Sequence, residues 1–331
     1  MIDDEACARN SEQSITYISG YGYSASAGQL DVFMAEELGY FDDLCLDVEI
    51  NAAGANGQQL VSSGTAQFTE LGSAEDVLMA AGNSENITAV ATYGTTSPFC
   101  IFANESITDL KDLEGGTLGY FINLTPSAPA MLDAAGADID KVEVLQMTNY
   151  DPTIVTRGQV DAIVGYASNQ CATLRAMGED FNEFVPEDFG LGGTYNVMEV
   201  NTEFLTNNRE VAADFMRATL KALDHCLADE DDCVTRISEL AAENDQGDAF
   251  PIEQQERTWS VESQWVRDNA GGAPGVPTVE SWENSSDIVE EFGSVKDIPP
   301  VTDVLDTDLV TSLYDSEGAL IWPGDDAEED E

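Results

Sequence analysis

The chain has 331 residues and a formal net charge of −52, from 64 Asp and Glu against 12 Lys and Arg. Apolar residues make up 43% of the chain, which excludes an intrinsically disordered acidic protein because such chains lack the aliphatic content for a core. The charge disfavours nucleic acid and anionic membrane surfaces as partners, and no stretch approaches the ~18–20 continuous apolar residues of a spanning helix.

From residue 14 onward, the chain predicts strands that alternate with helices. Strands are expected over residues 14–20, 46–51, 67–71 and 87–93, and helices over residues 28–38, 57–63 and 74–81. The first of these helices has apolar residues at helical spacing and stops at Gly39, a residue type typical of helix C-termini. This alternation is typical of a parallel sheet wound by crossover helices.

A second series of the same kind follows. Strands are expected over residues 97–103, 117–121, 142–147 and 160–166, and helices over 107–113, 125–135, 149–157 and 169–177. A strand over 194–200 leaves this series, and the rest is helical, over 209–227, 234–243, 252–268 and 278–292. A chain of this length favours two domains, and we place the crossings between them near Pro98 and Asn196. The prediction is an α/β fold of two mostly parallel sheets with a helical C-terminal segment.

The excess of acid favours a protein adapted to high salt. A folded domain with this much self-repulsion needs strong screening, and molar salt shortens the Debye length to about 3 Å. A calcium-storage or cation-binding protein is the alternative, but the chain lacks an Asp-x-Asp-x-Asp-Gly loop followed by a spaced Glu.

The six cysteines favour disulfides in an oxidising compartment, because their number is even and none forms a Cys-x-x-Cys pair. Cys226 and Cys233 flank a short loop between two helices and are one candidate pair. Cys7 with Cys45 and Cys100 with Cys171 are the pairs we expect among the 15 pairings that six cysteines allow. Six buried free thiols remain the alternative.

Motifs of hydrolytic, metal or nucleotide chemistry are absent from the sequence. There is no Gly-x-Ser-x-Gly, no His-Glu-x-x-His and no Gly-x-x-x-x-Gly-Lys, and the one histidine, His225, falls within a predicted helix. We therefore expect no catalytic residue, no metal and no cofactor. Loops that follow strands and enter helices are the candidate binding elements, because ligands of open α/β sheets gather outside the carboxyl ends of the strands.

Six stretches in order resemble the substrate-binding proteins of ABC importers, in the group that handles nitrate, sulfonates, taurine and thiamine-precursor pyrimidines. The six stretches lie between residues 33 and 223, and the resemblance covers roughly residues 14–225. The matching stretches are Phe33–Phe41, Leu46–Ile50, Leu60–Phe68, Ile107–Gly119, Arg157–Tyr166 and Phe215–Leu223.

The resemblance implies a two-lobed clamp that binds a small-molecule solute and does no chemistry. Lobe 1 would comprise residues 14–97 and 198–331, lobe 2 residues 98–197, and residues 1–13 and 325–331 would be flexible ends. The protein would be an extracytoplasmic monomer, periplasmic or at the cell surface, that delivers solute to the permease subunits of an ABC transporter. A lipid anchor and a sensory role stay open, as does a pyrimidine-precursor synthase, an enzyme that this fold also includes.

The solute is expected to be a neutral or weakly basic heteroaromatic compound, such as a pyrimidine vitamin precursor. No Lys or Arg lies between Arg9 and Lys111, so the lobe 1 loops lack a cation for a sulfonate or nitrate, the alternative solutes. Gly165–Gln170 resembles a stretch of the pyrimidine-precursor branch, with Gln170 in place of a glutamate. The candidate ligand residues are aromatic or polar loop residues: Tyr21, Tyr23, Ser24, Ser73, Glu75, Phe121, Asn123, Thr125, Tyr166, Asn169 and Tyr195.

Overall fold

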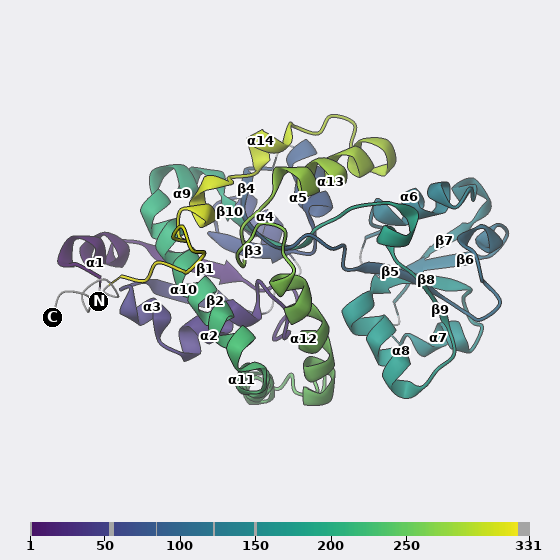
Figure 1. Cartoon of the computed structure of the whole chain (residues 1–331), viewed down its shortest axis with the longest axis horizontal. Helices are drawn as coiled ribbons and strands as arrows, with labels where there is room; N and C mark the ends of the chain where they lie inside the picture. Colours follow the sequence, from purple (N-terminus) through teal and green to yellow (C-terminus); the bar gives the residue numbers. More distant parts are fainter. Residues whose placement is uncertain (1, 53–55, 84, 122, 149–150, 324–331) are drawn as a thin grey trace.

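The computed structural model describes residues 2–52, 56–83, 85–121, 123–148 and 151–323. These residues form two bodies, each built on its own five-stranded sheet, and Figure 1 shows the two sheets at different ends of an elongated molecule. We call the body that contains the N-terminal strands the first body, and the other the second body.

The sheet of the first body contains four strands of one direction and one of the opposite direction. Its order is β2-β1-β3-β10-β4, with β1 parallel to β2 and β3, and β10 antiparallel to β3 and β4. Strand β4 is buried along its whole length and mostly apolar, as expected where helices cover both faces of a sheet. The bounds are β1 (Ser14–Ile18), β2 (Asp47–Asn51), β3 (Phe68–Leu71), β4 (Ile87–Gly94) and β10 (Tyr195–Asn201).

The sheet of the second body has the same plan. Its order is β7-β6-β8-β5-β9, with β6 parallel to β7 and β8, and β5 antiparallel to β8 and β9. The chain passes between the two sheets over residues 95–98 and 185–194, close to the crossings predicted at Pro98 and Asn196. The bounds are β5 (Phe99–Ala103), β6 (Thr117–Tyr120), β7 (Glu143–Gln146), β8 (Ala162–Tyr166) and β9 (Asn182–Phe184).

Helices cover both sheets, and their apolar sides form the cores. The largest core cluster joins α2 and α10 to the sheet of the first body, and two smaller clusters lie in the second body. The helices are α1 (Asp4–Ser11), α2 (Leu30–Glu37), α3 (Tyr40–Asp43), α4 (Gly57–Ser62), α5 (Ala74–Gly82), η1 (Leu110–Leu113), α6 (Ser127–Ala134), η2 (Ile139–Lys141), α7 (Thr153–Thr156), η3 (Ala167–Cys171), α8 (Ala172–Met177), η4 (Pro186–Phe189), α9 (Thr202–Asn207), α10 (Arg209–Ala228), α11 (Glu230–Glu243), α12 (Ile252–Arg267), α13 (Val279–Phe292), α14 (Val301–Val304) and α15 (Asp308–Thr311).

Two of the C-terminal helices contact both bodies. Helix α12 packs on α11 and β4 of the first body and also on η3 and α8 of the second. Helix α13 packs on α5 of the first body and on α6 of the second. In Figure 1, α12 lies between the two bodies.

Most predicted elements are present, and the differences lie mainly at their ends. The helix predicted over 107–113 is the short 3₁₀ turn η1, and the one predicted over 169–177 begins as the π-helical turn η3 before α8. The helix predicted over 149–157 is α7, whose predicted start at residues 149–150 lies outside the described residues. Strand β9 was not predicted, because three residues carry no periodicity, and it forms by pairing with β5.

The flexible end predicted for residues 1–13 is wrong for Asp4–Ser11, which form helix α1. A disulfide joins Cys7 to Cys45, and Asn10 is fully buried, with Nδ2 donating to the Leu44 carbonyl at 2.8 Å. Arg9 forms an ion pair with Asp214 of α10, 2.6 Å from Nη2 to Oδ2. These contacts are with distant parts of the chain, which local sequence patterns do not reveal. The other predicted flexible end, residues 325–331, lies outside the described residues.

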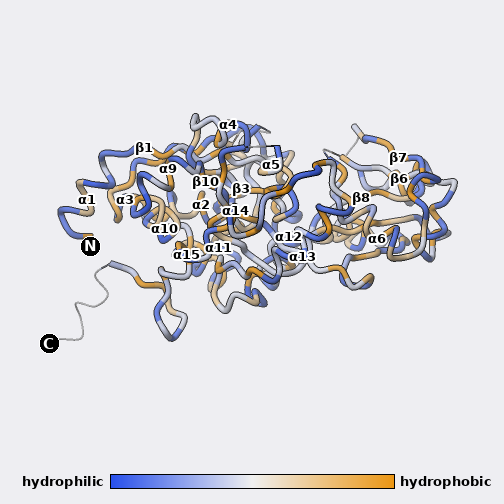
Figure 2. Tube along the Cα trace, turned by 90° about the horizontal axis from the view of Figure 1, so that it is seen from above, coloured by the Kyte–Doolittle hydropathy of each residue, from blue (hydrophilic) through white to orange (hydrophobic). Residues whose placement is uncertain are grey.

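Apolar and hydrophilic residues are interspersed along both bodies, as Figure 2 shows. Among the described residues, no helix combines the length and the apolar character that crossing a bilayer requires.

Candidate functional site

A cavity of about 390 Å³ lies where the two bodies face each other. The first body contributes loop and helix residues that follow β1 and β3, the second contributes β5, β8, η3 and the loop before α6, and α12 closes one side. The lining residues are Tyr21, Ser24, Ser26, Gln29, Asp76, Phe99, Phe121, Asn123, Thr125, Val164, Gly165, Tyr166, Ser168, Asn169, Gln170, Asn196, Phe250, Thr258 and Glu262.

Seven of the predicted ligand residues line this cavity, so the structure brings loops of both bodies to one place. They are Tyr21, Ser24, Phe121, Asn123, Thr125, Tyr166 and Asn169. Their direct contact with a solute stays a prediction. The strand-to-helix loops were the useful sequence signal, because the carboxyl ends of the parallel strands in each body point to the cavity.

The other four predicted residues do not line the cavity but lie behind its wall. Tyr23 packs on Phe33 in the core, with ring centroids 4.9 Å apart. The Tyr195 hydroxyl accepts a hydrogen bond from Ala27 N–H at 3.0 Å and is fully buried. Ser73 precedes α5 and donates to Asp76 Oδ2 at 3.1 Å. Glu75 is 2% exposed and is used in contacts between the bodies.

Glu75 joins the first body to the second through three hydrogen bonds. It lies in the first turn of α5 and accepts hydrogen bonds from Thr125 Oγ1 at 2.6 Å, from Ser127 N–H at 3.2 Å and from Ser127 Oγ. Burial raises the pKa of the Glu75 carboxyl, and the bonds from Ser127 and Thr125 oppose that rise. All three hydrogen bonds reach Glu75 as an acceptor at the start of α6. The N–H groups at this end of a helix favour a negative charge, as on a carboxylate.

Glu262 makes a second carboxylate bridge on the α12 side. Its Oε1 accepts a hydrogen bond from Ser168 Oγ of the second body at 2.6 Å. Its Oε2 accepts from Ser26 Oγ of the first body at 2.6 Å and from the Tyr195 hydroxyl. Burial raises the pKa of Glu262 to about 7. Sequence reasoning missed this residue, because nothing local places the helical segment 252–268 across the cavity.

Gln29 and Asp76 are two further lining residues that sequence reasoning missed. Gln29 Nε2 donates to Glu70 Oε1 at 2.8 Å, and Gly20 N–H donates to the same oxygen at 3.0 Å. Burial raises the pKa of Glu70 to about 8. Asp76, in the first turn of α5, has its pKa raised to about 7 by burial and then by the charge of Glu75. The available signal for Asp76 was its place in the first turn of the predicted helix 74–81, directly after Glu75.

The second body approaches the first closely at Gly72. A Cβ built on Gly72 would overlap the Tyr166 hydroxyl oxygen, whereas the ring carbon that carries the hydroxyl is 3.5 Å away. Only a residue without a side chain lets this tyrosine reach the first body. The same tyrosine meets Phe99 edge to face, with ring centroids 5.3 Å apart.

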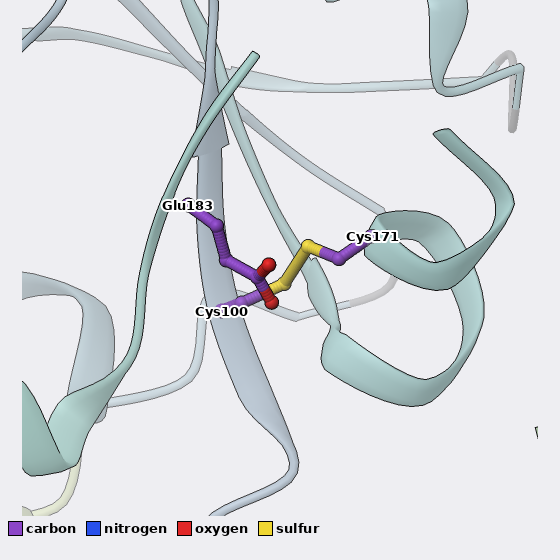
Figure 3. Close-up of side chains that lie close together, drawn as sticks. All are labelled: Cys100, Cys171 and Glu183. Atoms are coloured by element: carbon purple, nitrogen blue, oxygen red, sulfur yellow. A yellow bond between two sulfur atoms is a disulfide. The ribbon is translucent and has the colours of Figure 1, made fainter. Parts of the chain in front are cut away.

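All three expected disulfides are present: Cys7–Cys45, Cys100–Cys171 and Cys226–Cys233. Cys100–Cys171 ties β5 to η3, and its chain neighbours Phe99 and Gln170 line the cavity. Figure 3 shows that Glu183 lies beside this disulfide. These donor atoms lie within 4.8 Å of one another, but bonded sulfurs lack the thiolate that a metal ligand needs, and Glu183 pairs with Arg175.

The solved structures most similar in fold include binding proteins and an enzyme. The periplasmic aliphatic sulphonate binding protein SsuA of Escherichia coli superposes with a TM-score of 0.65 at 11% identity, over 88% of this chain and 91% of SsuA. The desulfurization enzyme DSZB superposes with a TM-score of 0.61 at 11% identity, over 90% of this chain and 98% of DSZB. These identities support the fold alone, which is that of the two-lobed periplasmic binding proteins.

Two proteins of named function are related in sequence. The formylaminopyrimidine-binding protein of Halalkalibacterium halodurans is 28% identical over 264 residues, covering 76% of this chain and 78% of that protein. The riboflavin-binding protein RibY of Chloroflexus aurantiacus is 28% identical over 193 residues, 56% of this chain and 54% of RibY. The NMT1/THI5-like family model matches residues 28–232, more than half of the chain. The chain therefore belongs to the NMT1/THI5-like family, which confirms the group that its sequence motifs indicated.

Proposed function

We propose that this protein is the extracytoplasmic solute-binding component of an ABC importer, and that it captures a small heteroaromatic solute, neutral or weakly basic, by closure of two lobes. We place lobe 1 at residues 14–97 with 198–331 and lobe 2 at residues 98–197, except that residues 195–197 of β10 pair with β3 and β4 and so belong to lobe 1. The main observation that supports this proposal is the composition of the cavity wall. The described residues of the wall include five aromatic rings and two carboxylic acids, and no Lys, Arg or His.

The aromatic rings of the wall suit a flat ligand. Phe99, Phe121 and Tyr166 come from the second body, whereas Tyr21 and Phe250 come from elements of the first. Rings on both sides of a cavity of about 390 Å³ favour a stacked heteroaromatic compound over an aliphatic one. The relatives named for formylaminopyrimidine and riboflavin support this choice.

A sulfonate or nitrate is less favoured, although SsuA shares the fold. An anion in this cavity would meet Asp76 and Glu262 with no cation among the described lining residues. Burial removes the water that would otherwise screen that repulsion. A heteroaromatic ligand avoids this electrostatic cost.

We also propose that the protein does no chemistry, in contrast to DSZB. The single histidine, His225, lies on α10, and its Nε2 is 3.0 Å from Asp232 Oδ2. It is absent from the residues that line the cavity. The relatives of named function are both binding proteins, which supports transport over a synthase reaction.

The extracytoplasmic location is supported by the three disulfides, because such bonds form and persist in oxidising compartments. We expect the protein to act as a monomer on the permease subunits of its transporter. High-salt adaptation rests on the net charge of −52. If it is correct, the melting temperature rises steadily between 0.1 and 3 M KCl, since screening relieves self-repulsion. A melting temperature that falls or stays constant over that range contradicts it.

The solute class is tested by native mass spectrometry and calorimetry on protein purified in high salt without refolding. We expect a retained small molecule or tight binding of hydroxymethylpyrimidine or riboflavin. Tight binding of taurine or nitrate, with no binding of either heteroaromatic compound, would reject the proposal.

A further inference from the structure

Gln29 carries a buried hydrogen-bond acceptor that no described residue satisfies. The residue is 2% exposed, it lines the cavity, and its Oε1 has no hydrogen-bond partner. Buried polar atoms in native proteins are nearly always paired, so an unpaired one at a cavity wall needs a partner from outside the chain.

The orientation of the Gln29 amide follows from its neighbours. Its Nε2 donates to Glu70 Oε1, which also accepts the fixed N–H of Gly20. The Tyr17 hydroxyl lies at the other oxygen, Glu70 Oε2, and donates to the Gly28 carbonyl at 2.6 Å. Glu70 Oε1 is therefore an acceptor when the carboxyl group is ionised and also when it carries its proton on Oε2, against the Tyr17 hydroxyl. If the Gln29 amide were flipped, its oxygen would face Glu70 Oε1, which is also an acceptor. In the observed orientation, Gln29 Oε1 is therefore the atom that can accept a hydrogen bond from a ligand.

Asp76 adds a second acceptor to the same cavity. Its Oδ2 accepts one hydrogen bond from Ser73, which leaves most of the acceptor capacity of the carboxyl group unused by that contact. The donors of several neighbouring wall residues are already used within the protein. Ser26 and Ser168 donate to Glu262, and Thr125 donates to Glu75.

We propose that Gln29 Oε1 and the Asp76 carboxyl group accept hydrogen bonds from N–H groups of the solute, so that the cavity selects amino-substituted nitrogen heterocycles. This inference rests on the proposed function and adds which edge of the solute is recognised and by which residues. A compound of the same shape without N–H donors leaves Gln29 Oε1 buried without a partner and leaves Asp76 with only the hydrogen bond from Ser73. The penalty for such a mismatch exceeds that for a missing apolar contact.

The test compares two probes of nearly equal shape, 4-amino-2-methylpyrimidine and 2,4-dimethylpyrimidine, by calorimetry in molar KCl. For the unmodified protein we expect the amino probe to bind at least about tenfold more tightly, as expected when an acceptor loses its donor. Gln29→Met and Asp76→Asn should each lower that ratio several-fold, mainly by weakening the amino probe. Gln264→Met on exposed α12 surface and Asp133→Asn on exposed α6 surface are the controls, and both should keep the ratio.

Equal affinity of the two probes for the unmodified protein overturns the inference. A ratio that both variants retain also overturns it. If neither probe binds, the inference is also overturned. In that case, binding of hydroxymethylpyrimidine or riboflavin would still support the proposed function. Thermal melting of each variant checks folding, and the ratio in the unmodified protein remains decisive if a variant does not fold.

Discussion

The Glu75 carboxylate of α5 accepts a hydrogen bond of 2.6 Å from Thr125 Oγ1, and this contact joins the two bodies at the rim of the cavity. Thr125 lines the cavity, whereas Glu75 lies behind it. Ser127, the first residue of α6, adds its N–H and hydroxyl to the same carboxylate. One buried side chain of the first body thus holds the start of a helix in the second.

Replacing Glu75 by Gln should weaken solute binding about tenfold or more. The amide keeps the shape but gives up a charge-assisted acceptor, and hydrogen bonds to charged groups contribute about 1.5–3 kcal/mol. The closed arrangement loses that contribution, while each body keeps its own core. Calorimetry measures the change in Kd, and small-angle scattering with and without solute measures closure. Asp133→Asn, on the exposed side of α6, should leave both unchanged. Unchanged affinity in Glu75→Gln would show that this bridge does not hold the closed form.

Gly72→Ala should weaken binding through a clash with the Tyr166 hydroxyl. Overpacking of this kind costs about 1–3 kcal/mol, which corresponds to tenfold or more in Kd near the middle of that range. Tyr166→Phe removes the clashing oxygen, and the remaining ring carbon is 3.5 Å from the new methyl group. The double variant should therefore bind better than Gly72→Ala alone. If it binds equally poorly, the effect of the alanine lies elsewhere, for instance in its backbone.

Removing the Cys100–Cys171 disulfide should lower both solute affinity and stability more than removing Cys226–Cys233. The first closes a sequence separation of 71 residues and the second one of 7. The chain-entropy estimate gives about 4 kcal/mol for the first and about 2 kcal/mol for the second. Only Cys100–Cys171 ties together segments that line the cavity, at Phe99 and Gln170. Alanine variants of each pair, compared by chemical denaturation and calorimetry, measure both effects. Equal losses of affinity in the two variants would contradict a local role for the first disulfide.

The buried carboxyl of Glu70 should make the protein lose stability as the pH rises. Burial raises its pKa from 4.5 to about 8, so the folded state binds more protons than the unfolded state between those values. The free energy of unfolding therefore falls with rising pH over that window, by up to about 1.4 kcal/mol per pH unit from this group. Full stabilisation is present below pH 4.5 and is lost as the pH passes 8.

Glu70→Gln should flatten this slope, because the amide does not titrate. Denaturation curves at pH 5, 6, 7 and 8 in constant molar salt measure it. Asp31, whose pKa burial raises to about 7, and the hydroxyls of Tyr17 and Tyr93 belong to the same buried network and stay in place in the variant. Glu49→Gln, on the exposed side of β2, is the matched control and should keep the slope. An equal slope in both variants would assign the pH dependence to other groups.

Local patterns in the sequence were sufficient for most of the order of strands and helices, for the family and for the pair Cys226–Cys233, which is 7 residues apart. Helix α2 shows why: its apolar spacing and its stop at Gly39, which has a φ of 77°, involve residues within a few positions of one another. The loops that hold Tyr21, Asn123 and Tyr166 could be found in the same way, because strand ends and helix starts are local features. Their common position at one cavity follows from the parallel arrangement of each sheet.

Only the tertiary structure decided which polar groups face the cavity and which hold the bodies together. Ser26 and Glu262 meet across 236 residues of sequence, and Glu75 and Thr125 across 50. The predicted ligand residues Glu75 and Tyr195 lie outside the cavity wall, whereas Gln29 and Asp76 line it. Burial and pairing depend on which helix packs on which strand. Sequence alone therefore indicated a two-lobed clamp whose first loops lack cations. The packing of α12 against both bodies determined which of its polar side chains line the cavity.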